Sequence, residues 1–241
     1  RRPPRPRDRS AEKRLHASAC NTMPHWLVIG GTITGGGGTH NKPNLAWPAL
    51  LDAQLTVLFK NAVGPDYFLQ CPQNFMPARN QIDGVIYDFG PNMFGKTAAL
   101  SLATLINTTR HLTNSDTAAI VAWPRLDNKQ DLRQSVLAAE MAHATLIEVE
   151  HNRSLYFDAV HPNLKGHAEI ARAVDQYLRN AQQDLARTRS NNHSRAFMIQ
   201  PVEAPQFDAS NQSNQTSEFC FHNASRLPVV EHTADWSLVE E

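Results

Sequence analysis

The stretch WLVIGGTITGG, residues 26–36, decides which fold to expect. Its first four residues are apolar, which is typical of a buried strand, and the glycines that follow favour a tight turn. Two later apolar runs also end in glycine, TVLFKNAVG at Gly64 and DGVIYDFG at Gly90. The runs TAAIVAW (117–123) and ATLIEVE (144–150) complete a set of five predicted strands.

Predicted helices alternate with these strands. An amphipathic stretch over 45–55, with Pro48 in its first turn, predicts the first helix. Apolar stripes and Ala/Leu-rich composition predict three more, over 96–111, 131–143 and 164–185. Apolar strands that alternate with helices indicate a parallel sheet covered on both faces, which is a three-layer α/β/α sandwich.

A carboxylate and an imidazole stand three residues apart just ahead of the last predicted helix, since FDAVHPNLKGH contains Asp158 and His161. A carboxylate at this spacing can hold an imidazole in one tautomer and stabilise its protonated form, so the histidine can act as a general base. Taken alone the pair is a weak motif, because surface Asp/His pairs share the spacing. In parallel α/β sheets, however, ligands bind at the carboxyl ends of strands, where the glycine-ended loops lie.

In order along the chain, four blocks resemble those of the SGNH (GDSL-like) hydrolase family. GGTITGG (30–36) is similar to the first block in its G-G-S-I-T-x-G form, found in some eukaryotic members, and NAVG (61–64) is similar to the second. DGVIYDFGPN (83–92) resembles the third block, and FDAVHPNLKGHAEIA (157–171) resembles the fifth, D-x-x-H-P-x-x-x-G-H. The resemblance spans about residues 26–178 and implies the SGNH hydrolase fold with a flavodoxin-like parallel sheet.

The resemblance implies a role for each matching residue. Thr32 stands where the family has its nucleophilic serine, His161 would be the general base, and Asp158 would orient it. The backbone N–H groups of Thr32 and Gly64 and the side-chain amide of Asn92 would form the oxyanion hole. The implied reaction is hydrolysis of a small or carbohydrate-linked acyl ester, with neither a metal nor another cofactor.

Threonine at position 32 leaves two interpretations open. Its methyl group makes the side chain β-branched and restricts χ1, and a hydroxyl misplaced by about 1 Å can lower a rate roughly a hundredfold. Either Thr32 is the nucleophile of an active esterase, or the chain is a catalytically impaired pseudo-hydrolase that binds an ester or glycan without turnover.

A phosphate-binding motif overlaps the third block. GPNMFGKT (90–97) satisfies G-x-x-x-x-G-K-[S/T] between a predicted strand and a predicted helix. In that interpretation Gly95 belongs to a nucleotide-binding loop, Lys96 binds phosphates and Thr97 holds Mg²⁺. No second predicted strand ends in a magnesium-binding acid, so nucleotide binding is the less favoured alternative.

Composition divides the chain into three parts. Residues 1–24 begin with a basic, proline-interrupted run, which predicts a disordered arm. Residues 25–185 hold the hydrolase-like domain, and residues 186–241 are polar, with FCFHNASRLPVV as a candidate strand pair that would begin a truncated second β module. The formal net charge of zero argues against a nucleic-acid partner. The resemblance implies a small-molecule or glycan ester as the partner.

Signals for localisation are mixed. No apolar stretch approaches the roughly 20 residues of a membrane span, and no signal-peptide core is visible. The three cysteines are too few and too scattered for a metal site or a disulfide framework. Residence in the secretory pathway stays open because six N-x-[S/T] sequons are present, at Asn107, Asn152, Asn192, Asn211, Asn214 and Asn223.

Overall fold

The computed structural model describes residues 23–40, 42–70, 72, 76, 82–195 and 229–232. Its sheet has five parallel strands, β1 (His25–Gly30), β2 (Gln54–Phe59), β3 (Gly84–Asp88), β4 (Ala118–Ala122) and β5 (Thr145–Glu148). A sixth strand, β6 (Val229–His232), pairs antiparallel with β2, which gives the order β5-β4-β3-β1-β2-β6. The parallel strands therefore follow the flavodoxin-like order 2-1-3-4-5 that was expected.

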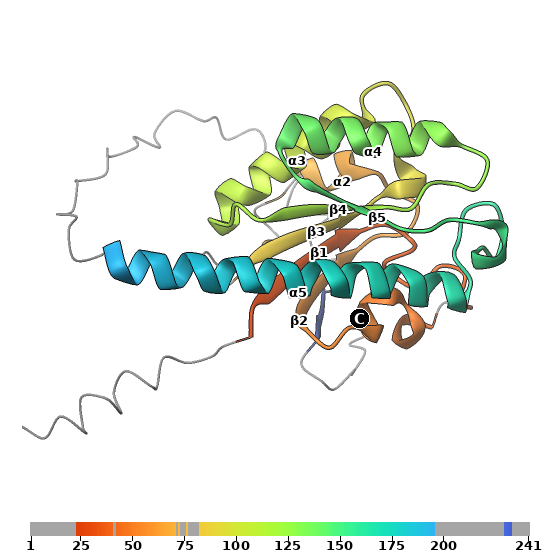
Figure 1. Ribbon diagram of the computed structural model, residues 1–241. Helices are drawn as coiled ribbons and strands as arrows, with labels where there is room; N and C mark the ends of the chain where they lie inside the picture. The colour runs from red at the N-terminus through yellow and green to blue at the C-terminus, as the bar shows by residue number, and fades with distance from the viewer. Residues whose placement is uncertain are drawn as a thin grey trace, which may run out of the picture.

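Helices cover both faces of this sheet (Figure 1). One face carries α2 (Pro65–Leu69), α3 (Ala98–Thr113) and α4 (Lys129–Ala142). The other carries the long α5 (Leu164–Arg195) and the short 3₁₀ helix η2 (Trp47–Leu50), which follows η1 (Pro43–Leu45). Two further 3₁₀ turns are η4 (Gly90–Asn92) and η5 (Arg153–Leu155). The predicted three-layer α/β/α sandwich is confirmed.

The strands contribute alternate side chains to two separate cores, because successive side chains of a strand point to opposite faces. In β1, Leu27 and Ile29 pack in the core formed with α2, α3 and α4. Trp26 and Val28 pack in the core formed with α5 and η2. All four side chains are fully buried, which explains why the strand is an uninterrupted apolar run.

Two elements differ from their predicted boundaries near the carboxyl ends of the strands. No α-helix forms over 45–55; η1 and η2 occupy its first half, and β2 already begins at Gln54. The Trp47 backbone N–H donates to His167 Nδ1 and the Trp47 indole donates to Asp88, so contacts with remote parts of the chain fix this segment as short 3₁₀ turns. The strand predicted to reach Gly64 ends at Phe59. Residues 60–64 are therefore a loop after β2, at the edge where ligands bind.

The last helix also differs from its predicted end at residue 185. Helix α5 continues to Arg195, and its exposed side is lined by ion pairs such as Arg179–Asp175 at 2.8 Å, which stabilise a polar helix surface. Strand β6 brings four residues of the predicted tail into the main sheet. The remaining tail predictions, and the basic arm up to residue 22, lie outside the described residues.

Within the described residues, no helix combines the length and the apolar character that crossing a membrane requires.

Candidate active site

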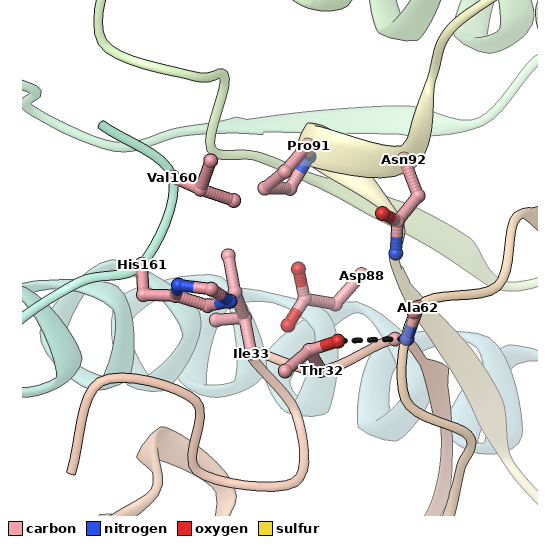
Figure 2. A pocket seen from close by; sticks show the side chains of 9 residues that line it. Thr32, Ile33, Ala62, Asp88, Pro91, Asn92, Val160 and His161 are labelled. Atoms are coloured by element: carbon pink, nitrogen blue, oxygen red, sulfur yellow. Dashed lines mark hydrogen bonds between the residues drawn. The ribbon is translucent and has the colours of Figure 1, made fainter. Parts of the chain in front are cut away.

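The carboxyl ends of β1, β2 and β3 surround a pocket of about 210 Å³ (Figure 2). The loop after β1, the loop after β2, the end of β3 with η4, and the loop before α5 all contribute to its wall. Three of the predicted site residues meet there. The lining residues are Gly31, Thr32, Ile33, Ala62, Asp88, Pro91, Asn92, Val160 and His161.

Asp158 holds the His161 ring from outside the pocket. Its Oδ2 lies 2.8 Å from His161 Nδ1, and its Oδ1 accepts the backbone N–H groups of Val160 and His161, each at 2.7 Å. Partial burial acts to raise the pKa of Asp158, but these hydrogen bonds outweigh it and keep that pKa below its ordinary value. With Asp158 ionised, the proton of neutral His161 lies on Nδ1, so Nε2 is free to act as a general base.

The Thr32 hydroxyl is turned away from His161. Its Oγ1 accepts the backbone N–H of Ala62 at 2.8 Å, as the dashed line in Figure 2 shows. Among the described residues, no hydrogen bond joins this hydroxyl to His161. A β-carbon built on Gly37 would lie 2.7 Å from Thr32 Cγ2 and 2.8 Å from His161 Cδ2, so the methyl group occupies the histidine side.

Ala62 presents its amide to the pocket, whereas Gly64 does not line it. Ala62 has a φ of 57°, a left-handed conformation that is uncommon for residues other than glycine. Gly64 has a φ of −93° and precedes the first turn of α2. Gly64 was predicted from the resemblance of residues 61–64 to the second block, and an alanine offers no comparable sequence signal.

The Asn92 side chain supplies a second donor. A β-carbon on Gly31 would lie 2.5 Å from Asn92 Nδ2, so only glycine at position 31 leaves room for this amide. The Asn92 backbone N–H donates to the Phe89 carbonyl at 2.7 Å, which fixes the turn. Within the described part of the chain, the Asn92 amide has no hydrogen-bond partner, so both of its N–H bonds are available to a ligand.

Asp88 was not predicted as a site residue. It ends β3 and is only 1% exposed. Its Oδ2 accepts hydrogen bonds from Thr34 Oγ1 and Trp47 Nε1, both at 2.8 Å. Burial raises the pKa of Asp88 to about 6, although the hydrogen bonds from Trp47 and Thr34 act to lower it. Standing at the end of an apolar run, this aspartate gives no sequence signal that separates it from a loop residue.

A buried histidine supports the nucleophile turn. His167 is fully buried; its Nε2 donates to the Gly37 carbonyl at 2.9 Å, and its Nδ1 accepts the Trp47 backbone N–H at 3.2 Å. Gly37 in turn donates its N–H to the Thr32 carbonyl at 2.8 Å. Burial lowers the pKa of His167 to about 4, although the bond to Gly37 acts to raise it. The neutral ring therefore ties α5 to the loop that carries Thr32.

We expect Asp88→Asn to change how stability depends on pH. The folded-state pKa of Asp88 is raised, so its stabilising contribution is present below about pH 4 and is lost as pH rises through 6, by about 3 kcal/mol. Asparagine keeps an acceptor for Thr34 and Trp47 but does not ionise. The free energy of unfolding of the variant, minus that of the parent, should rise by about 2 kcal/mol between pH 4 and 7 in denaturant titrations. A constant difference would refute this assignment, and the exposed control Asp116→Asn should show none.

The candidate nucleotide-binding residues lie apart from the pocket. Gly95, Lys96 and Thr97 are exposed where α3 begins, whereas Asn92 of the same segment lines the pocket. Within the described residues, no group of three or more potential metal-ligating side chains occurs. The structure thus separates the lysine-bearing part of this segment from the part that resembles the hydrolase block.

Neither a model of a known protein family nor a curated protein matches the sequence, but solved structures match the fold. A family two carbohydrate esterase from Cellvibrio japonicus is 18% identical with a TM-score of 0.52, over 67% of this chain and 62% of that chain. The chain has the SGNH hydrolase fold. A family two carbohydrate esterase from Clostridium thermocellum, in complex with cellohexaose, is 13% identical with a TM-score of 0.53, over 65% of this chain and 64% of that chain.

The SGNH hydrolase fold expected from the four sequence blocks is therefore confirmed. The chain spans just under two thirds of the length of these esterases. At such low identity the similarity shows the fold alone. The roles of Thr32, Asn92, Asp158 and His161, and the G-G-S-I-T-x-G subtype, stay predictions.

Proposed function

We propose that this chain is an SGNH-type esterase that hydrolyses a small or carbohydrate-linked acyl ester. The observation that carries the proposal is that Thr32, the Ala62 amide, the Asn92 side chain and His161 line one pocket, with Asp158 bonded to His161. A hydroxyl, an oriented base and oxyanion donors are the parts that acyl transfer requires. A pocket of about 210 Å³ is smaller than most sites for drug-sized ligands, which favours a short acyl group.

One rotation about the Cα–Cβ bond of Thr32 would prepare the site for reaction. It would turn the hydroxyl toward His161 and at the same time release the Ala62 N–H. Oγ1 then bonds to the ester carbonyl carbon while His161 Nε2 takes the hydroxyl proton. The carbonyl oxygen becomes an oxyanion, and the N–H groups of Ala62 and Asn92 stabilise it, together with the Thr32 N–H.

The rest of the cycle uses the same base twice. The tetrahedral adduct collapses, the bond to the leaving oxygen breaks, and His161 gives its proton to that oxygen. A water molecule then loses a proton to His161 and attacks the acyl carbon. The bond between the acyl group and Thr32 breaks, the proton returns to the Thr32 oxygen, and the carboxylic acid leaves.

The small volume of the pocket and the exposure of its catalytic pair favour a small acyl group on a large alcohol. The His161 and Asp158 side chains are 29% and 45% exposed, so the leaving group departs into open space. The Clostridium thermocellum esterase of similar fold was solved with cellohexaose, which supports an acylated carbohydrate as the substrate class for this chain too. The apolar side chains in the lining are those of Ile33, Pro91 and Val160.

A pseudo-hydrolase is the second candidate, and the Thr32–Ala62 hydrogen bond is the observation that favours it. The bond occupies an oxyanion donor and keeps the methyl group beside His161. If this rotamer persists, the pocket binds an ester or a glycan without turnover.

Thr32→Ser distinguishes the two candidates. Serine lacks the methyl group and rotates more freely at χ1. For an esterase we expect the parent to hydrolyse p-nitrophenyl acetate, Thr32→Ser to raise kcat/KM by about ten- to a hundredfold, and Thr32→Ala to remove the activity. For a pseudo-hydrolase, Thr32→Ser should hydrolyse the ester faster than the His161→Ala control, whereas the parent should not. Lys96→Ala, exposed and outside the pocket, is the matched control; inactivity of both parent and Thr32→Ser would reject the proposed chemistry.

A further inference from the structure

The Asp88 carboxyl lies in the wall of the pocket where the oxyanion would form. It lines the same pocket as Ala62, Asn92 and His161, and Figure 2 shows it between Asn92 and His161. The proposed reaction gives this group no role: it is neither nucleophile, base, orienting acid nor donor. A buried carboxyl in such a place requires an explanation.

One oxygen of Asp88 is held and the other is not. Thr34 and Trp47 both donate to Oδ2, whereas Oδ1 is buried without a partner among the described residues. A buried, ionised carboxylate is costly unless it is paired and hydrogen-bonded. Because Oδ2 already accepts two hydrogen bonds, Oδ1 is the oxygen that a proton would occupy.

The surroundings of Asp88 do not neutralise a negative charge. Among the described residues that line the pocket, none is a lysine or an arginine. The titratable groups that face Asp88 are His161 across the pocket and His167 behind Trp47, whose backbone N–H donates to it. His167 stays neutral because burial lowers its pKa to about 4. An ionised Asp88 would therefore repel an anion in a setting where charges interact more strongly than in water.

We propose that Asp88 gates the pocket, so that a small anion is held beside Ala62 and Asn92 only while the Asp88 carboxyl is protonated. Two anions are relevant, the tetrahedral oxyanion and the carboxylate product. The oxyanion case rests on the proposed function, whereas binding of a free carboxylate does not require turnover. Because burial raises the pKa of Asp88 to about 6, the gate works near neutral pH.

Acetate is the probe that tests the gate, with NMR titrations of the parent, Asp88→Asn and Asp116→Asn between pH 6 and 8. In the parent, the fraction with protonated Asp88 falls from about one half at pH 6 to about one hundredth at pH 8. The apparent Kd for acetate should therefore rise about fiftyfold. Asp88→Asn cannot ionise and should lack this factor. A change shared by both proteins does not come from Asp88. Asp116→Asn, an exposed aspartate outside the pocket, should follow the parent.

Equal pH dependence in the parent and in Asp88→Asn would overturn the gate, and so would absence of acetate binding to the parent at pH 6. A second measurement needs no variant. By linkage, saturating acetate must raise the midpoint of the Asp88 carboxyl titration seen by ¹³C NMR, and an unmoved midpoint also overturns the gate. Acetate binding of the expected kind without hydrolysis of p-nitrophenyl acetate would refute the proposed function and leave the gate intact. Hydrolysis of p-nitrophenyl acetate together with an acetate affinity that does not depend on pH would refute the gate and leave the proposed function intact.

Discussion

Replacing His161 with alanine is expected to lower kcat/KM for p-nitrophenyl acetate by about 10³- to 10⁴-fold, toward the rate left by the oxyanion donors alone. His161 is the only histidine in the described lining of the pocket, and Asp158 is hydrogen-bonded to its ring. Without it, neither the Thr32 hydroxyl nor the second-step water loses its proton. Initial rates at pH 7 with purified protein measure the effect.

The double variant Thr32→Ala/His161→Ala gives a sharper form of the same prediction. Because the two groups act as a unit, the double variant should be no slower than either single variant. If the rate losses of the two single variants multiply in the double variant, the residual hydrolysis uses another nucleophile. Lys96→Ala should keep the parent rate, since that side chain is exposed and lies outside the pocket.

Replacing Asn92 with alanine is expected to lower kcat by about 10²- to 10³-fold, or about 3–4 kcal/mol. Its amide has no hydrogen-bond partner in the described part of the chain and points into the pocket beside Ala62 (Figure 2). A donor that meets charge only in the transition state changes kcat far more than KM. Steady-state kinetics separate the two constants.

Asn92→Asp controls for shape. The carboxylate fills nearly the same volume but offers no donor, so it should be at least as slow as Asn92→Ala. Circular dichroism should show both variants folded, because the turn is fixed by the backbone bond from Asn92 to Phe89. A loss of less than about threefold in both would place the oxyanion away from Asn92.

The fold could be predicted from the sequence wherever a buried element is an uninterrupted run of apolar residues. Trp26 to Ile29 read as a strand because each of these side chains is buried on one of two covered faces. The failure over 45–55 has a tertiary cause, since the Trp47 backbone N–H donates to His167, 120 residues away, and the Trp47 indole donates to Asp88. Strand β6 was missed as part of this sheet because its partner, β2, is even more remote along the chain.

The sequence predicted only those site residues whose amino-acid type, at that place in a motif, indicates their role. Asp158 and His161 stand in a short motif, and Thr32 and Asn92 follow glycine-ended strands. Ala62 could not be found this way, because the backbone N–H that it contributes is common to every residue except proline. Asp88 was missed because its chemistry depends on burial and on one unpartnered oxygen, neither of which a sequence displays.

Labelling with a small alkyl fluorophosphonate tests the central claim most directly. The hydroxyl of Thr32 would displace fluoride, and His161 would take its proton, to leave one stable phosphonyl ester. We expect intact-protein mass spectrometry to show a single adduct, peptide mapping to place it on Thr32, and Thr32→Ala and His161→Ala both to abolish it. An unlabelled Thr32, or an adduct that survives in Thr32→Ala, would contradict the account.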